Sequence, residues 1–269
     1  MTNPERLPPI VSAAWVRDHV GDRPLVICDV RSTMGGVDPD AGFADGHLPD
    51  AVLVVLDAVL ATAPRGAHGR HPLPSPTEFA HSLGQLGIDD DDVVVVYDDR
   101  GGTFAGRLVW MLRIIGRRAA LLDGGLANWD GELDTGPPAA RAVAASTPTD
   151  WPRHAIADAD EVAAHVAAGG VVIDSREPAR YAGEFEPIDA VAGHVPGAIN
   201  LPFAENLERD GRFRSPDDLA RRFASAADDG APIVYCGSGV TACHNALAIE
   251  HSGLALPRVY VGSWSGWTA

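Results

Sequence analysis

Cysteine is scarce in this 269-residue chain, which contains only Cys28, Cys236 and Cys243. Three cysteines with such uneven spacing do not make a disulfide framework, and the spacing does not match that of metal-ligand motifs. We therefore expect a protein that works in a reducing compartment and needs neither a metal nor another cofactor.

Positive charge is scarce as well. The chain has 21 Lys and Arg against 37 Asp and Glu, a formal net charge of −16 and a sequence pI of about 4.8. Nucleic acids and anionic membrane surfaces attract basic proteins, so we expect neither as a partner. No apolar run approaches the roughly 18 residues of a membrane span, and residues 1–6 have no apolar signal core. These absences predict a cytoplasmic location.

The chain contains a long internal repeat. Both halves have, in the same order, an apolar segment ending in Asp-x-Arg, a Gly-His-x-Pro turn, a second apolar segment, and a segment with glycine and tryptophan. These features lie at residues 24–31 and 171–176, 46–49 and 193–196, 93–98 and 232–236, and 124–129 and 262–267. A repeat of roughly 140 residues is too long for a solenoid unit, so each half should be a domain of its own.

Short apolar segments alternate with helical stretches in each half. This pattern predicts an α/β fold with two tandem domains, each a parallel sheet with helices on both faces. We place the first domain at residues 1–138 and the second at 156–269, with a linker rich in Ala, Ser, Thr and Pro at 139–155. Because they recur, the Asp-x-Arg pairs are expected to be structural ion pairs, and His47 and His194 to hold their turns by hydrogen bonds.

Residues 233–242 place Cys236 between an apolar strand and a helix, in a loop with Gly237 and Gly239. Such a loop turns backbone N–H groups inward at a helix N-terminus, where negative charge is favoured and a cysteine ionises easily. The first half has Asp98 at the corresponding position, and a carboxylate cannot act as a sulfur nucleophile. Only the second half is therefore expected to be catalytic, although a buried, inert Cys236 is an equal alternative on these residues alone.

The repeated motifs, the Cys-Gly-Ser-Gly-Val-Thr-Ala loop at 236–242 and the terminal segment 261–267 resemble the tandem-domain rhodanese sulfurtransferases over nearly the whole chain. The resemblance implies an inactive first domain and an active second one, in which Cys236 carries sulfur as a persulfide. It further implies that loop residues Gly237, Gly239, Val240 and Thr241 bind the substrate. The implied partners are a small anionic sulfur donor and an acceptor, which is thioredoxin, a small thiol or cyanide.

The residues after the cysteine favour one of two subfamilies. Enzymes for thiosulfate, a dianion, typically carry basic side chains there, whereas Gly237 and Ser238 are neutral. The loop is therefore similar to that of 3-mercaptopyruvate sulfurtransferases, where Ser238 would belong to a Ser-His-Asp relay that protonates pyruvate enolate. The resemblance points to His71 and Asp57 as the other members. Without it, His71 is more simply a loop histidine.

The same resemblance points to Arg180 as the group that binds the substrate carboxylate. Mercaptopyruvate enzymes usually have a second arginine nine residues later, but this chain has Asp189 there. Arg107 of the first half is a candidate substitute, and thiosulfate stays open as an alternative donor.

Two further classes share this fold. Dual-specificity phosphatases need an arginine at the position of Ala242, which argues against phosphate chemistry. A non-catalytic module that carries sulfur or binds a partner is the remaining alternative, because a cysteine and a glycine-rich loop also suit a sulfur carrier.

Overall fold

The computed structural model describes residues 7–19, 25–34, 36–227 and 231–269. Contacts divide the chain into two compact units. Unit 1 comprises Met1–Ala61, Pro74–Trp151 and Asp210–Arg212; unit 2 comprises Thr62–Leu73, Pro152–Arg209 and Phe213–Ala269. The sequence placed residues 62–73 in the first domain, whereas contacts assign them to unit 2.

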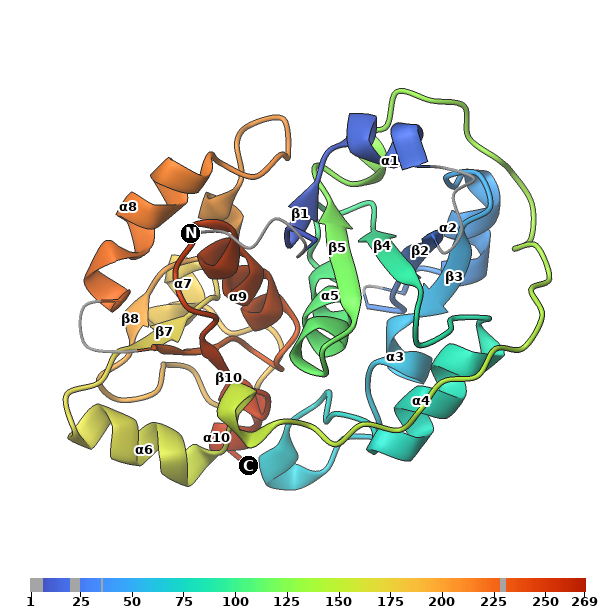
Figure 1. Ribbon diagram of the computed structural model, residues 1–269. Helices are drawn as coiled ribbons and strands as arrows, with labels where there is room; N and C mark the ends of the chain where they lie inside the picture. The colour runs from blue at the N-terminus through green and yellow to red at the C-terminus, as the bar shows by residue number, and fades with distance from the viewer. Residues whose placement is uncertain (1–6, 20–24, 35, 228–230) are drawn as a thin grey trace. The chain divides into compact units, whose positions relative to one another are not determined.

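Unit 1 contains a five-stranded sheet in the order β1-β5-β4-β2-β3, with every pair parallel (Figure 1). Its strands are β1 (Ile10–Val11), β2 (Leu25–Arg31), β3 (Val52–Val55), β4 (Val93–Tyr97) and β5 (Arg118–Leu122). The central strands β2 and β4 are buried along nearly their whole length. Continuous apolar segments such as these are typical of parallel strands covered on both faces.

Helices cover both faces of this sheet: α1 (Ala13–His19), α2 (Pro39–Asp45), α3 (Leu56–Val59), α4 (Pro76–Gln85) and α5 (Ala105–Ile114), with a short 3-10 helix η2 (Leu126–Asn128). Val16 of α1 and Phe43 of α2 pack in one core cluster with Ile27 and Val95 of the sheet. The apolar helix α5 is buried at every position and packs along β4 and β5 (Figure 1).

Unit 2 has a sheet of the same topology, in the order β6-β10-β9-β7-β8 and again parallel throughout. The strands are β6 (Ile156–Ala157), β7 (Val172–Asp174), β8 (Ile199–Asn200), β9 (Ile233–Tyr235) and β10 (Arg258–Tyr260). The helices are α6 (Ala159–Ala167), α7 (Pro178–Tyr181), α8 (Pro216–Ala227), α9 (Thr241–His251) and α10 (Ser263–Trp267), with 3-10 helices η1 (Gly66–His68), η3 (Arg153–Ala155) and η4 (Phe203–Asn206).

The helices of unit 2 also lie on two sides of their sheet. Val162 of α6 and Trp264 of α10 share a core cluster with Ile233 and Tyr235 of β9. Helix α9 packs against β9 and β10, and α8 lies beside α9 (Figure 1). The matching strand orders confirm the predicted fold class of two tandem α/β domains.

Both Asp-x-Arg motifs form buried ion pairs where a strand ends. Arg31 donates to the two carboxylate oxygens of Asp29, at 2.7 and 2.8 Å. Arg176 binds the two oxygens of Asp174 in the same fork geometry, at 3.0 and 2.6 Å. Two parallel N–H···O bonds are the strong form of this interaction. The prediction of structural ion pairs is confirmed.

The two turn histidines bind the carbonyl of an aromatic residue that each ring also stacks against. His47 Nδ1 lies 2.9 Å from the Phe43 carbonyl, with ring centroids 3.8 Å apart. His194 Nδ1 lies 2.8 Å from the Tyr181 carbonyl, with ring centroids 3.9 Å apart. The prediction that these histidines hold their turns is therefore confirmed.

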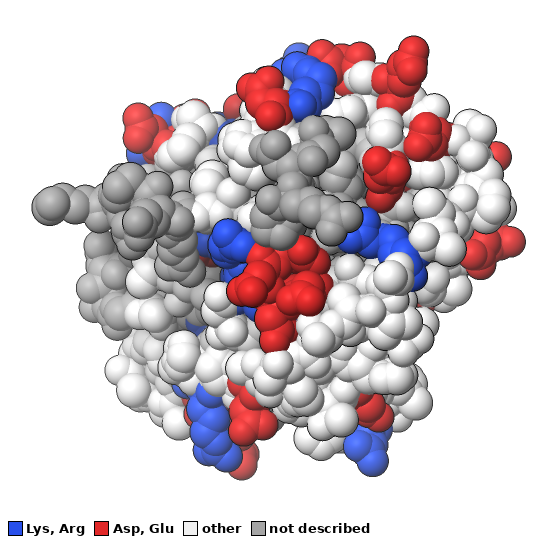
Figure 2. All heavy atoms as spheres, turned by 45° about the vertical axis from the view of Figure 1, so that its right-hand side comes forward, with Lys and Arg blue, Asp and Glu red and all other residues white. Residues whose placement is uncertain are grey.

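The surface carries charges of both signs. In Figure 2, acidic side chains gather at several places on the face shown, and basic ones lie among them. Within the described residues, no helix is long and apolar enough to cross a membrane. Nor do three or more His, Cys, Asp or Glu side chains of that part of the chain come together in a way that would hold a metal ion.

In unit 1, the Asp98 carboxylate fills the loop that follows β4. One oxygen accepts the backbone N–H groups of Arg100 and Gly102, both at 2.8 Å. The other accepts those of Phe104 and Ala105, at 2.7 and 2.9 Å. Burial raises the pKa of the Asp98 carboxyl, and the four amides oppose that rise. The backbone N–H groups of the loop before α5 thus converge on one side-chain carboxylate, which accepts their hydrogen bonds.

Replacing Asp98 by Asn should destabilise unit 1. The amide NH₂ would face two buried N–H donors, and leaving such donors unpaired costs roughly 1–3 kcal/mol. We expect a loss of about 2 kcal/mol in unfolding free energy, seen as a fall in Tm of roughly 4–8 °C by calorimetry. Asp91→Asn, at an exposed position of the preceding turn, is the control and should leave Tm unchanged. Equal Tm values for Asp98→Asn and wild type would contradict this account.

Candidate active site

Cys236 lies directly after β9, at the carboxyl end of the central strand of unit 2, and its side chain is 2% exposed. Gly239 has φ of +77°, a conformation that glycine adopts without strain. This path brings the Gly239 N–H to 3.1 Å from Cys236 Sγ, just before α9 begins at Thr241. The strand, loop and helix predicted around the cysteine are present, with a backbone donor directed at the sulfur.

The first turn of α10 fixes the same loop from the other side. Ser263 Oγ accepts the N–H of Cys236 at 3.1 Å and lies 4.0 Å from its sulfur. The N–H groups of Trp264 and Ser265 donate to the carbonyls of Cys236 and Gly237, both at 2.9 Å. The backbone on both sides of the sulfur is therefore held by hydrogen bonds.

Sequence reasoning missed Ser263. It is one of two described non-glycine residues with positive φ, at +53°. The corresponding residue of the repeat is Gly125, with φ of +57°. The only signal in the sequence was a serine where the other half of the repeat has glycine, and strain at a non-glycine residue tends to be kept at functional sites.

Ser238 and His71 lie together in unit 2. Ser238 Oγ is 2.8 Å from His71 Nδ1, and both residues are buried. His71 belongs to Thr62–Leu73, which approaches α10 so closely that only glycine fits at two points. A Cβ atom at Gly262 would lie 2.7 Å from the Ala67 carbonyl oxygen, and one at Gly266 would lie 2.4 Å from the same atom. The close backbone packing of this segment places the imidazole beside the serine.

Asp57 and Arg107 both belong to unit 1. The Asp57 carboxylate accepts a hydrogen bond from Thr33 Oγ1 at 2.9 Å. The Arg107 side chain is fully buried, and its Nε donates to the Leu60 carbonyl at 3.1 Å. Their expected roles, as the third relay member and as a substitute arginine, stay predictions.

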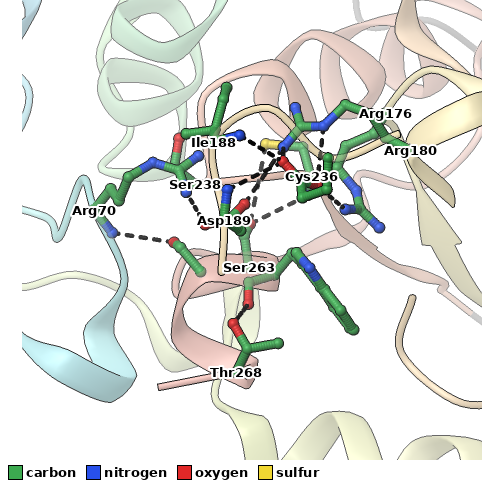
Figure 3. A network of polar contacts seen from close by, with 12 residues as sticks. Arg70, Arg176, Arg180, Ile188, Asp189, Cys236, Ser238, Ser263 and Thr268 are labelled. Atoms are coloured by element: carbon green, nitrogen blue, oxygen red, sulfur yellow. Dashed lines mark hydrogen bonds and ion pairs between the residues drawn. The ribbon is translucent and has the colours of Figure 1, made fainter. Parts of the chain in front are cut away.

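Arg180 of α7 lies beside the cysteine loop in a network of charges (Figure 3). It donates to Glu186 at 2.7 and 3.1 Å, and also to Asp189 at 3.3 Å. Arg70 forms an ion pair with the other oxygen of Asp189. Both arginines face the loop, since a Cβ atom at Gly237 would lie 3.1 Å from Arg70 and 3.4 Å from Arg180. Sequence reasoning missed Arg70, whose only signal was its place next to His71.

The two carboxylates of this network differ in their pKa shifts. Burial would raise the pKa of Glu186, but Arg180 and the N–H groups of Asp189 and Ile188 hold it below its usual value. At Asp189, burial prevails over the attraction of Arg70 and raises the pKa. Glu186 is therefore the better stabilised anion of the two.

The other two cysteines are packed into the fold. Burial raises the pKa of the Cys28 thiol to about 12. Cys243 is fully buried in α9, and its thiol donates to the Gly239 carbonyl at 3.2 Å. Ala242 is fully buried as well, so the arginine of a phosphatase loop has no place in this structure.

Two parallel sheets with the same strand order define the class of protein, together with a cysteine in the loop between the central strand of one sheet and the helix that follows it. The chain belongs to the rhodanese-like domain family, which it matches over residues 12–132 and 158–269. The fold and the recognised family agree with the expectation from sequence.

Known relatives cover nearly the whole chain. The Pseudomonas aeruginosa protein named "Probable 3-mercaptopyruvate sulfurtransferase" is 40% identical, over 96% of this chain and 94% of the relative. A Mycobacterium tuberculosis protein provisionally named thiosulfate sulfurtransferase SseB is 37% identical, over 93% of this chain and 90% of its own. The crystal structure of SseA from Escherichia coli, described as a 3-mercaptopyruvate sulfotransferase, superimposes with a TM-score of 0.82 at 30% identity, covering 96% of this chain and 99% of SseA.

The Gly239 amide should matter to the reactivity of Cys236 and not only to stability. Gly239→Ala forces alanine into the left-handed region, which costs roughly 1–2 kcal/mol, and moves the N–H away from the sulfur. We expect alkylation of Cys236 by iodoacetamide, followed by mass spectrometry, to slow by about tenfold, or roughly 1.4 kcal/mol.

Gly253→Ala is the matched control, because Gly253 has φ of +83° with open space where a Cβ would lie. It should lower Tm by a similar amount and leave the alkylation rate unchanged. If both variants slow alkylation equally, the Gly239 N–H has no special role.

Proposed function

We propose that this protein is a sulfurtransferase that takes sulfur from 3-mercaptopyruvate, releases pyruvate, and passes the sulfur through a Cys236 persulfide to a thiol or to cyanide. The observation that supports this most is the 2.8 Å contact of Ser238 Oγ and His71 Nδ1 beside the cysteine loop. Abstraction of sulfur from a keto acid needs a proton donor at that place, whereas thiosulfate does not. The relatives named for 3-mercaptopyruvate support the same donor.

The Cys236 thiolate attacks the thiol sulfur of the substrate. A sulfur–sulfur bond forms, the carbon–sulfur bond breaks, and its electron pair leaves on the carbon as pyruvate enolate. Ser238 supplies the proton that turns the enolate into pyruvate, and His71 restores the proton to Ser238. By the family resemblance, Asp57 is proposed as the third member of the relay.

Backbone N–H groups stabilise the anionic sulfur during this step. The loop residues Gly237, Gly239, Val240 and Thr241 precede or begin α9, where the helix dipole favours negative charge.

Arg180 is proposed to bind the carboxylate of the donor. An acceptor thiolate, of thioredoxin or of a small thiol, then attacks the outer sulfur and releases the Cys236 thiolate. We also propose a cytoplasmic location, as expected from the sequence.

Thiosulfate is the second candidate donor. The Mycobacterium tuberculosis relative carries that substrate in its name, and Asp189 stands where a second carboxylate-binding arginine was expected.

Parallel steady-state kinetics with both donors separate the two assignments, with pyruvate release and thiocyanate formation as readouts. We expect a higher kcat/KM for 3-mercaptopyruvate. No pyruvate from unmodified wild-type protein, when iodoacetamide labelling of a separate sample of the same preparation shows that Cys236 is reactive, would exclude the first donor.

A sulfur-carrier module is distinguished by stoichiometry. A catalyst releases many pyruvate molecules per chain when an acceptor thiol is present, whereas a module that only stores sulfur stops after one. Cys236→Ser should abolish both the turnover and the mass increase of one sulfur atom on the protein.

Ser238→Ala separates the relay from simple sulfur capture. Loss of a positioned proton donor typically costs 10²–10⁴-fold, so we expect kcat for pyruvate release to fall by about 100-fold. The thiosulfate reaction of the same variant should change by less than about threefold, because sulfite leaves without needing a proton at carbon. Equal losses with both donors would remove the relay from the mechanism.

A further inference from the structure

The network beside Cys236 holds a carboxylate where the carboxylate of a substrate is expected (Figure 3). Both described partners of the Asp189 side chain are arginines, Arg70 and Arg180. We propose that Asp189 is an internal competitor in the anion-binding position of the active site. Arg70 and Arg180 together bind the donor's carboxylate once the Asp189 side chain has turned away. This inference rests on the proposed function and names the groups that recognise its substrate.

The two arginines are placed for a donor that reacts at Cys236. Gly237 follows the nucleophile directly, and both guanidinium groups lie within 3.5 Å of the position that a Cβ would take there. Sulfur and carboxylate of 3-mercaptopyruvate are separated by only two carbon atoms. A donor with its sulfur at Cys236 therefore has its carboxylate within reach of the Arg70 and Arg180 guanidinium groups beside Gly237.

Other members of the network already have structural tasks. Glu186 accepts two hydrogen bonds from Arg180, one from Arg176 at 3.2 Å, and the N–H groups of Ile188 and Asp189, both at 3.1 Å. These contacts fix the orientation of Arg180 and the path of the segment after α7. Glu186 is thus part of the framework, whereas the described contacts of the Asp189 side chain are those to the two arginines.

A rotation of the Asp189 side chain is enough for the exchange. The backbone is held on both sides, because the Asp189 N–H donates to Glu186 and Trp264 Nε1 donates to the Val191 carbonyl at 2.8 Å. Burial also disfavours the charge of Asp189 where it now lies. Substitution of one carboxylate for another leaves both arginines paired, so the exchange buries no unpaired charge.

Arg70 supplies the second guanidinium that the chain lacks at position 189. Its N–H donates to Ser265 Oγ at 3.1 Å, which ties the residue to the turn that also holds Cys236. Its side chain is 26% exposed, against 6% for Asp189, so a ligand can approach it from solvent. A planar fork that binds two carboxylate oxygens makes arginine suited to this task.

The first test replaces Asp189 by Asn, which keeps the shape and removes the charge. If Asp189 competes with substrate, KM for 3-mercaptopyruvate should fall by about tenfold, with a smaller change in kcat. If the carboxylate instead only holds the loop in place, the substitution should raise KM or lower kcat. Asp217→Asn, an exposed position of α8, makes the same change in net charge and should leave KM unchanged.

The second test replaces Arg70 by Met, which should raise KM by about tenfold, while Arg70→Lys should recover part of the loss through its charge. Arg221→Met, at a position that is 71% exposed, is the control for the loss of one positive charge. An unchanged KM in Arg70→Met would remove Arg70 from the binding site.

Calorimetry with pyruvate measures carboxylate binding without turnover, and pyruvamide is the neutral control ligand. Asp189→Asn should tighten pyruvate binding about tenfold and leave pyruvamide unaffected. If the variant changes neither the pyruvate Kd nor KM while the wild type turns over, the inference is wrong and the proposed function stands. If the wild type releases no pyruvate but the variant gains affinity for pyruvate, the proposed function is wrong and the carboxylate site stands.

Discussion

Hydrogen bonding by backbone amides at the carboxyl end of the central strand is the interaction on which both units depend. A buried N–H group needs an acceptor, so a loop that turns its amides inward also requires something electron-rich at its centre. Unit 1 meets this need with the Asp98 carboxylate, which accepts four N–H groups. In unit 2 the acceptor is the Cys236 sulfur. The corresponding loops of the two units thus differ in their acceptor, which is a carboxylate in unit 1 and a cysteine sulfur in unit 2.

Electrostatics around Cys236 are local. The net charge of −16 should repel an anionic donor at long range, yet charges separated by more than about 10 Å are largely screened in salt solution. Near the sulfur, three arginines meet three carboxylates in close, mostly buried ion pairs. In the proposed mechanism, attraction of a donor depends on which of these ion pairs opens, and not on the total charge of the chain.

The repeat in the sequence was sufficient to predict the fold, because strand ends and turns recur in the same order in both halves. The repeat also identified Cys236 as the candidate nucleophile, because the corresponding loop of the first half has Asp98 at that position. The partners of the site were harder to predict. Ser238 and His71 are 167 residues apart, and only a family resemblance linked them. Arg70 and Ser263 went unnoticed because their roles follow from a long-range backbone path and a left-handed φ, which leave no periodic pattern in the sequence.

Residues 62–73 have a consequence for how this protein can be divided. They are encoded in the first half of the chain but belong to the compact unit that contains Cys236. A fragment starting at Pro152 would keep the cysteine loop and the whole second sheet, yet it would lack His71 and Arg70. The two halves of the repeat therefore do not coincide with two self-sufficient modules, because the unit that contains Cys236 also includes residues 62–73 from the first half.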